Sequence, residues 1–290
     1  MYADNPLAQV IQDEHVAGAG KSVEEIAAEA REVMEKNRIC LVRDFPLDPD
    51  RYLDFLGHFG EPLMNYSSLS ELEKTDPHPQ INRVKYKKKA GGAQSVHYVA
   101  GGLRPHSARS WRSPRPSHFA MLMVEPGWRE VPAGERGESI VVSWYDLFNR
   151  LAERDGEVFE EHFARLSTTP LTFEANNVRE ELSDLPLLYP LADARGPYDV
   201  GVRLKQDLRD KILGIQEQIP EFEAYQKSLH YLLDASADEQ FFACFPMDGG
   251  DLLLIDNHRF AHGRLKIVGE YTVDGEARTN NRELWSVTVH

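Results

Sequence analysis

The segment Leu103-Arg104-Pro105-His106-Ser107-Ala108-Arg109-Ser110-Trp111 decides how this chain is interpreted. A second histidine segment, Asp256-Asn257-His258-Arg259-Phe260-Ala261-His262-Gly263-Arg264, follows far downstream. Neutral imidazole is a common metal ligand, so His106 and His262 are candidate partners. Their wide separation in sequence predicts that they lie on different strands and meet only in the folded protein.

Ala108 is the unusual residue of the first segment. An iron site of two histidines and one carboxylate leaves open positions on the metal for other ligands. In its usual sequence form, an Asp or Glu stands two residues after the first histidine. Here that position is Ala108, whose methyl group cannot ligate iron. The change leaves one metal position and one negative charge unsupplied. Since a halide ion fills both gaps, the sequence predicts an iron site altered to carry chloride.

The composition limits the class of protein. A chain of 290 residues with 41% hydrophobic and 10% aromatic residues suits a single β-rich domain. No apolar run approaches the ~20 residues that span a membrane, and the N-terminus lacks a secretory signal. Cys40 and Cys244 lie in apolar segments, as buried reduced thiols of a cytoplasmic protein would. The net charge of −14 argues against binding to nucleic acid polymers, and the oligomeric state stays open.

The periodicity of apolar residues predicts strands on both sides of a helical insertion. Ser22 and Glu25 form a capping-box pattern at the start of one helix. We therefore expect a mainly β fold, with a double-stranded β-helix (jelly roll) core decorated by N-terminal and inserted helices. The chain 1–290 would be one domain, with a mostly helical insertion around 145–235. The expected helices are 22–37, 49–59, 145–165 with a break at Asp155-Gly156, and 205–234 as one helix or two separated near Pro220. The expected strands are 38–43, 81–86, 118–124, 139–143, 241–246, 251–256 and 283–289.

Several segments together resemble the taurine dioxygenase/clavaminate synthase-like branch of the Fe(II)/2-oxoglutarate oxygenases. The likeness covers most of the chain, and its elements occur in the order typical of the family. The histidine-glycine-arginine segment with a later arginine-bearing strand is its most specific part. The segments that carry the resemblance are 55–62, 103–116, 137–139, 256–264 and Arg282 with Leu284-Trp285.

The resemblance implies roles for individual residues. His106 and His262 would hold Fe(II), and O2 would be the oxidant. Arg282 would pair with the distal carboxylate of 2-oxoglutarate, with a hydrogen bond from the Ser139 hydroxyl. Arg278 is the competing candidate for the co-substrate arginine, because the stretch 273–281 is longer than is usual in the family.

Ala108 departs from the hydroxylase pattern in the way that the family's radical halogenases do. The resemblance then implies that chlorine, instead of hydroxyl, is delivered to an unactivated carbon. Arg109 is a candidate for a positive charge beside the bound halide. Two alternatives stay open: hydroxylation with another metal ligand, and a non-catalytic jelly-roll binding protein. A substitution engineered into an ordinary site would also explain an alanine here.

A run of lysines suggests the substrate class. Lys85, Lys87, Lys88 and Lys89 stand out in an acidic chain and favour a phosphate-bearing small molecule, such as the nucleotide dAMP. Trp111 is a candidate for stacking on a base. The plainer interpretation is a solvated charge run and a buried core aromatic, and a free amino acid is the alternative substrate.

Overall fold

The computed structural model describes residues 5–65, 76–86, 100–112, 115–127, 131–173 and 184–290. Two β-sheets form its centre, and their neighbouring strands are antiparallel except for the short pair β1 and β2. The larger sheet has the order β1 (Val16–Ala17), β2 (Ile39–Arg43), β12 (Leu252–Asp256), β5 (His118–Glu125), β16 (Glu283–Val289) and β3 (Asn82–Lys85). The smaller sheet has the order β11 (Ala243–Phe245), β6 (Ser139–Ser143), β13 (Phe260–Ile267) and β4 (Gly101–His106).

The two sheets enclose one apolar core. Phe119 and Met121 of β5 pack in the same buried cluster as Val141 of β6 and Phe260 of β13. In both sheets, strands from distant parts of the sequence are neighbours, as in a double-stranded β-helix. The jelly-roll core predicted from the sequence is therefore confirmed.

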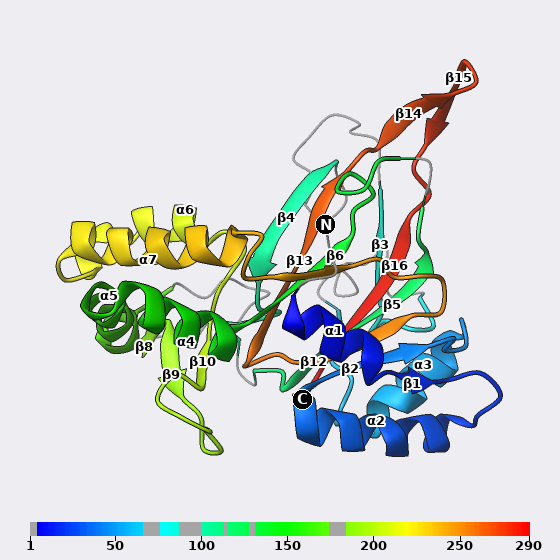
Figure 1. The fold of residues 1–290 in the computed structure, drawn as a ribbon, viewed down its shortest axis with the longest axis horizontal. Coiled ribbons are helices and arrows are strands. Elements are labelled where there is room, and N and C mark those ends of the chain that lie inside the picture. The colour runs from blue at the N-terminus through cyan, green and yellow to red at the C-terminus, as the bar shows by residue number, and fades with distance from the viewer. Residues whose placement is uncertain (1–4, 66–75, 87–99, 113–114, 128–130, 174–183) are drawn as a thin grey trace.

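Helices cover the outer faces of both sheets (Figure 1). Apolar residues of α2 and α3 pack on the larger sheet, and α4, α5 and α7 pack in one cluster with buried residues of the smaller sheet. The structure therefore has four layers, with the sheets inside. The helices are α1 (Pro6–Asp13), α2 (Val23–Asn37), α3 (Pro49–Gly57), α4 (Trp144–Asp155), α5 (Glu157–Thr168), α6 (Leu208–Leu213) and α7 (Phe222–Ala237).

The predicted helix starts and stops agree well with the observed ones. Ser22 and Glu25 form both hydrogen bonds of the capping box at α2. Gly156, at φ 53°, separates α4 from α5. The span between α5 and α6 also contains short strands that the periodicity did not predict, and α1 and the β14–β15 hairpin were missed as well. These strands are β7 (Pro170–Leu171), β8 (Leu185–Pro186), β9 (Leu188–Pro190), β10 (Val200–Val202), β14 (Glu270–Val273) and β15 (Glu276–Thr279).

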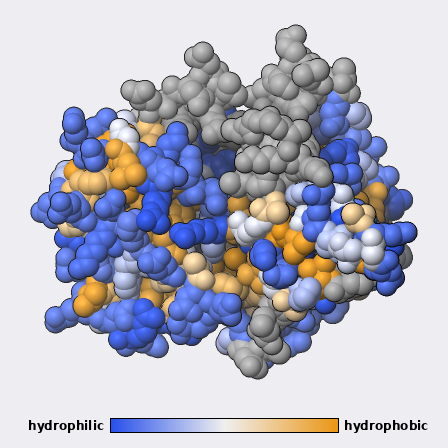
Figure 2. Space-filling view, turned by 90° about the horizontal axis from the view of Figure 1, so that it is seen from above, coloured by the Kyte–Doolittle hydropathy of each residue, from blue (hydrophilic) through white to orange (hydrophobic). Residues whose placement is uncertain are grey.

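The surface and the thiols complete the description. The face drawn in Figure 2 is mostly hydrophilic, and its hydrophobic residues form separate patches. None of the described helices has the length and hydrophobicity needed to cross a membrane.

Cys40 and Cys244 are both buried and unbridged, as expected, and burial raises the pKa of each thiol to about 12.

Gly263 allows β13 to approach β4 closely. A Cβ atom at this position would lie 2.6 Å from the Leu103 carbonyl oxygen and 3.0 Å from the Ile140 side chain. The register between the two strands shifts on each side of Arg264, and His262 stays opposite His106. The absent side chain of Gly263 thus lets the two histidines face each other.

We expect Gly263→Ala to destabilise the protein by about 1–3 kcal/mol, because a backbone oxygen has little room to move away. Gly102→Ala on β4 is the matched control, since its Cβ would come no closer than 3.5 Å to a neighbour. Urea unfolding of both variants measures the difference. Equal losses would show that the close approach at Gly263 does not limit the packing of the two strands.

Candidate metal and co-substrate site

His106 and His262 lie side by side on the smaller sheet, with His106 at the end of its edge strand β4. They are register partners on β4 and β13, and their ring centroids are 4.3 Å apart. With its proton on Nδ1, His106 donates to the Arg104 carbonyl oxygen, 3.0 Å away, and Nε2 carries the lone pair that a metal requires. Phe119 stacks on the His262 ring at a centroid distance of 4.0 Å. Packing and hydrogen bonding therefore orient both imidazoles.

The two histidines line a cavity of about 310 Å³ between the sheets. The sequence predicted Ala108, Ser139 and Arg282 for the same site, and all three line this cavity. The structure thus brings together residues from β4, β6, β13 and β16 and from the turn after β4.

Asn257 holds the backbone of Ala108. Its carboxamide accepts a hydrogen bond from the Ala108 amide at 2.9 Å and donates to the Ala108 carbonyl oxygen at 2.8 Å. It also donates to the Pro116 carbonyl oxygen at 3.1 Å, and Asn257 is fully buried. Asn257 was not predicted from the sequence, although it lies in the second histidine segment, because a buried asparagine has no distinctive sequence signal.

The donor set near the histidines fits a metal with two protein ligands. Among the described residues, no group of three His, Cys, Asp or Glu side chains is arranged to hold a metal ion. The methyl group of Ala108 borders the cavity where the usual site has a carboxylate. Imidazole nitrogens suit Fe(II), and the remaining ligands would then come from bound small molecules.

Arg282 provides a buried positive charge at the β6 and β13 side of the cavity. It is 5% exposed, and within the described part of the chain its guanidinium forms no ion pair. Burial, together with repulsion from Arg264, lowers the pKa of Arg282 well below its usual value. Arg264 also lines the cavity and is the register partner of Ser139. A buried guanidinium needs an anion, and the planar carboxylate of 2-oxoglutarate fits this requirement.

Arg278 does not line the cavity. It lies on β15 in the β14–β15 hairpin, where its side chain is 39% exposed and 3.7 Å from Glu276. The structure therefore places Arg282, rather than Arg278, beside the histidines.

Lys85, the one lysine of the run that the structure describes, does not line the cavity. Lys85 is exposed on β3 and forms an ion pair with Glu283 at 2.6 Å. Lys87, Lys88 and Lys89 lie outside the described residues. Trp111 does border the cavity but is only 1% exposed, and its indole nitrogen donates to the Arg203 carbonyl oxygen at 2.7 Å.

Other cations do line the cavity. Arg109 and Arg112 come from the turn after His106, and Lys205 comes from the inserted segment that precedes α6. Arg109 has φ 47°, an uncommon value for a residue with a side chain, and donates to the Met64 carbonyl oxygen. Lys205 was not predicted, because a single lysine in the insertion gives no sequence signal.

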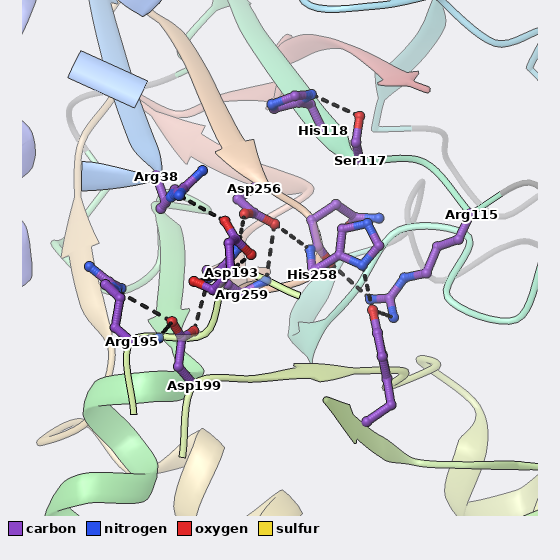
Figure 3. Close-up of polar contacts among 12 residues, drawn as sticks. Arg38, Arg115, Ser117, His118, Asp193, Arg195, Asp199, Asp256, His258 and Arg259 are labelled. Atoms are coloured by element: carbon purple, nitrogen blue, oxygen red, sulfur yellow. Dashed lines mark hydrogen bonds and ion pairs between the residues drawn. The ribbon is translucent and has the colours of Figure 1, made fainter. Parts of the chain in front are cut away.

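A buried ion cluster fixes the turn between β12 and β13 (Figure 3). Arg259 binds Asp199 at 2.9 Å, Asp256 at 2.9 Å and Asp193 at 2.7 Å. Hydrogen bonding to Arg259 lowers the pKa of Asp193. Asp193 and Asp199 belong to the insertion, so the cluster joins the insertion to the turn that precedes His262.

His258 has a structural role in the same turn. Burial, with repulsion from Arg115, lowers its pKa to about 4, so the ring is neutral at pH 7. The Tyr189 hydroxyl lies within hydrogen-bond distance of both His258 Nδ1 and Arg115. This third histidine is thus occupied away from the cavity.

Solved structures of iron oxygenases share this fold. A taurine dioxygenase from Burkholderia xenovorans is 14% identical over 95% of this chain and 86% of its own length, with a TM-score of 0.56. Asparagine oxygenase, in complex with Fe(II), 3-hydroxyasparagine and succinate, is 13% identical over 98% and 88%, with a TM-score of 0.59. The non-heme iron oxygenase OrfP, in complex with Fe and α-ketoglutaric acid, is 14% identical over 98% and 89%, with a TM-score of 0.57.

The family model of the taurine catabolism dioxygenase TauD, TfdA family matches residues 3–288. This match spans the two histidine segments, the helical insertion and the arginine of β16. The chain therefore belongs to the TauD/TfdA family of non-heme iron, 2-oxoglutarate-dependent dioxygenases.

Proposed function

We propose that this member of the family is a halogenase that chlorinates an unactivated carbon of a small molecule. Fe(II), 2-oxoglutarate, O2 and chloride would be its cofactors and co-substrates. One observation carries the proposal: Ala108 borders the cavity at the carboxylate position, and although Asp207 also lines the cavity, no described acidic residue forms a metal-binding group with the two histidines. A chloride ion supplies both the ligand and the negative charge that the alanine lacks.

When bound, iron would supply the oxidising chemistry, with 2-oxoglutarate converted to succinate and CO2. The protein would position the metal and 2-oxoglutarate and would exclude water from the cavity. His106 and His262 would bind the metal, and Arg282 with Ser139 would bind 2-oxoglutarate through its distal carboxylate. Asn257 keeps the Ala108 backbone in place, so the chloride position is bounded by a methyl group on a fixed turn. Arg109, which follows Ala108 and lines the cavity, would add positive charge.

For the substrate we propose an anionic small molecule, with a nucleotide such as dAMP as the leading candidate. The supporting charges are Arg109, Arg112 and Lys205, which line the cavity, whereas Lys85 faces Glu283 instead. A free amino acid is the alternative, since it also carries an anionic carboxylate. Asparagine oxygenase, with 3-hydroxyasparagine bound, has the same fold and makes this alternative worth testing.

Ala108→Asp should change the product. A new carboxylate on the metal would displace chloride, so the remaining turnover should yield hydroxylated rather than chlorinated product. Ala108→Gly is the matched control, because it adds no ligand and should keep chlorination. Mass spectrometry at fixed chloride measures the product ratio. Continued chlorination by an Asp variant whose carboxylate is shown to bind iron would contradict the halide assignment.

Arg282→Lys should raise the KM for 2-oxoglutarate at least tenfold, because one ammonium replaces a two-pronged donor. Arg278→Lys should leave this KM within a factor of two, since Arg278 lies on the hairpin. Coupled succinate release measures both. An effect at Arg278 with none at Arg282 would reverse the assignment.

Lys205→Met should weaken the binding of dAMP about tenfold, since it removes a charge-assisted contact. It should also reduce the preference for dAMP over deoxyadenosine. Lys211→Met on α6 is the control, being exposed and outside the cavity lining. Added salt should weaken dAMP binding in the unmodified protein. Equal turnover of nucleotide and nucleoside, or chlorination confined to amino acids, would reject the phosphate assignment.

A further inference from the structure

One face of β16 runs along the whole cavity. Arg282, directly before the strand, and Leu284, Ser286 and Thr288 within it are alternate residues, and all four line the cavity. Arg282 is at the co-substrate end. Thr288 is at the opposite end, where it is the register partner of Phe119. At about 3.3 Å per residue, Arg282 and Thr288 are roughly 20 Å apart along the strand. A five-carbon dicarboxylate bound at Arg282 does not reach Thr288.

Several of the side chains near Thr288 are polar and carry no charge. Asn82 of β3 is the register partner of Ser286, and its side-chain amide donates to the Ser286 hydroxyl at 3.4 Å. Gln80 precedes β3 and lines the same cavity, as does Ser110 from the turn after β4. We call Gln80, Asn82, Ser110, Ser286 and Thr288 the polar strip.

Three oxygen atoms of the polar strip are buried without a hydrogen-bond partner among the described residues. They are Thr288 Oγ1, Ser110 Oγ and Gln80 Oε1. Thr288 is 6% exposed and Ser110 is 2% exposed, and both border the cavity. A buried polar group without a partner is unfavourable, because it has lost its hydrogen bonds to water. Three such groups on one cavity indicate that hydrogen bonding is completed by what binds there.

The chemistry of the polar strip defines its ligand. Hydroxyl and carboxamide groups both donate and accept hydrogen bonds, and none of them carries a charge. The cavity also has cations, Arg109 and Arg112 in the same turn as Ser110 and Lys205 in the insertion, and these suit an anionic group. We propose that the polar strip is a second substrate subsite, which binds an uncharged group that both donates and accepts hydrogen bonds. A nucleobase edge and a carboxamide share this chemistry.

The inference rests on the proposed function only in that the substrate occupies this cavity. It does not depend on whether chlorine or hydroxyl is transferred. A site built to hydrogen-bond a group rejects the analogue that lacks it, because the buried polar atoms then stay unpaired. The polar strip would thus decide which anionic molecules are accepted.

The test is anaerobic calorimetry with protein, Fe(II) and 2-oxoglutarate, so that binding is measured without turnover. The first probe pair is dAMP and 2-deoxyribose 5-phosphate, which lacks the base. The second pair is L-asparagine and L-alanine, which lacks the carboxamide. In one pair, the first member should bind at least tenfold more tightly. The discriminating pair then identifies the source of the uncharged group.

Thr288→Val keeps the shape of the side chain and removes its hydroxyl. In the probe pair that discriminates, it should reduce the ratio of the two affinities about fivefold. The affinity for 2-oxoglutarate should stay within a factor of two. Thr272→Val, on the exposed face of β14, is the matched control and should change neither.

Three results would overturn the subsite. They are equal affinities within both pairs, including no binding of any probe; an unchanged ratio in Thr288→Val; and an equal loss of 2-oxoglutarate affinity in that variant. Absence of chlorinated product with the predicted binding pattern would reject the proposed reaction and leave the subsite standing.

Discussion

The carboxamide of Asn257 is the contact on which the site depends. It bridges the amide and carbonyl groups of Ala108 and reaches the Pro116 carbonyl oxygen from a fully buried position. Asn257 precedes β13, and Ala108 follows β4, so one side chain ties together the two segments that carry His106 and His262. Loss of this side chain would leave several buried backbone groups unpaired. The hydrogen bonds of Asn257 therefore help to fix both the spacing of the two imidazoles and the position of the Ala108 methyl group.

The two buried arginines Arg259 and Arg282 differ in how their charges are balanced. Arg259 forms ion pairs with three aspartates, so its positive charge is balanced within the protein. Arg282 is buried without an ion pair in the described part of the chain, and Arg264 lies close enough to lower its pKa. The protein thus neutralises the arginine that holds a turn, whereas Arg282 on the cavity has no acidic partner in the described part of the chain. This contrast supports the proposal that Arg282 binds an anionic co-substrate.

The sequence predicted the parts of this structure that local pattern controls. Apolar periodicity predicted β5, β6, β12 and β16, and the family-like segments around His106 and His262 predicted which imidazoles meet. The density of lysines near Lys85 did not indicate where their side chains point, and Lys85 faces Glu283. Lys205 and the polar strip were missed because their members are scattered in sequence and gathered only by strand register. The short strands β7 and β8 depend on tertiary pairing, which periodicity over two residues does not reveal.

The Arg259 cluster has a consequence for how the chain folds. Two of its three carboxylates, Asp193 and Asp199, belong to the insertion, whereas Arg259 lies in the turn before β13. Without the insertion, a buried guanidinium would lack most of its counter-charge, which is strongly unfavourable. The jelly roll and its insertion should therefore unfold in one cooperative transition. A shortened chain without the insertion would be expected to misfold at the turn that leads to His262, even though every strand of the core remained.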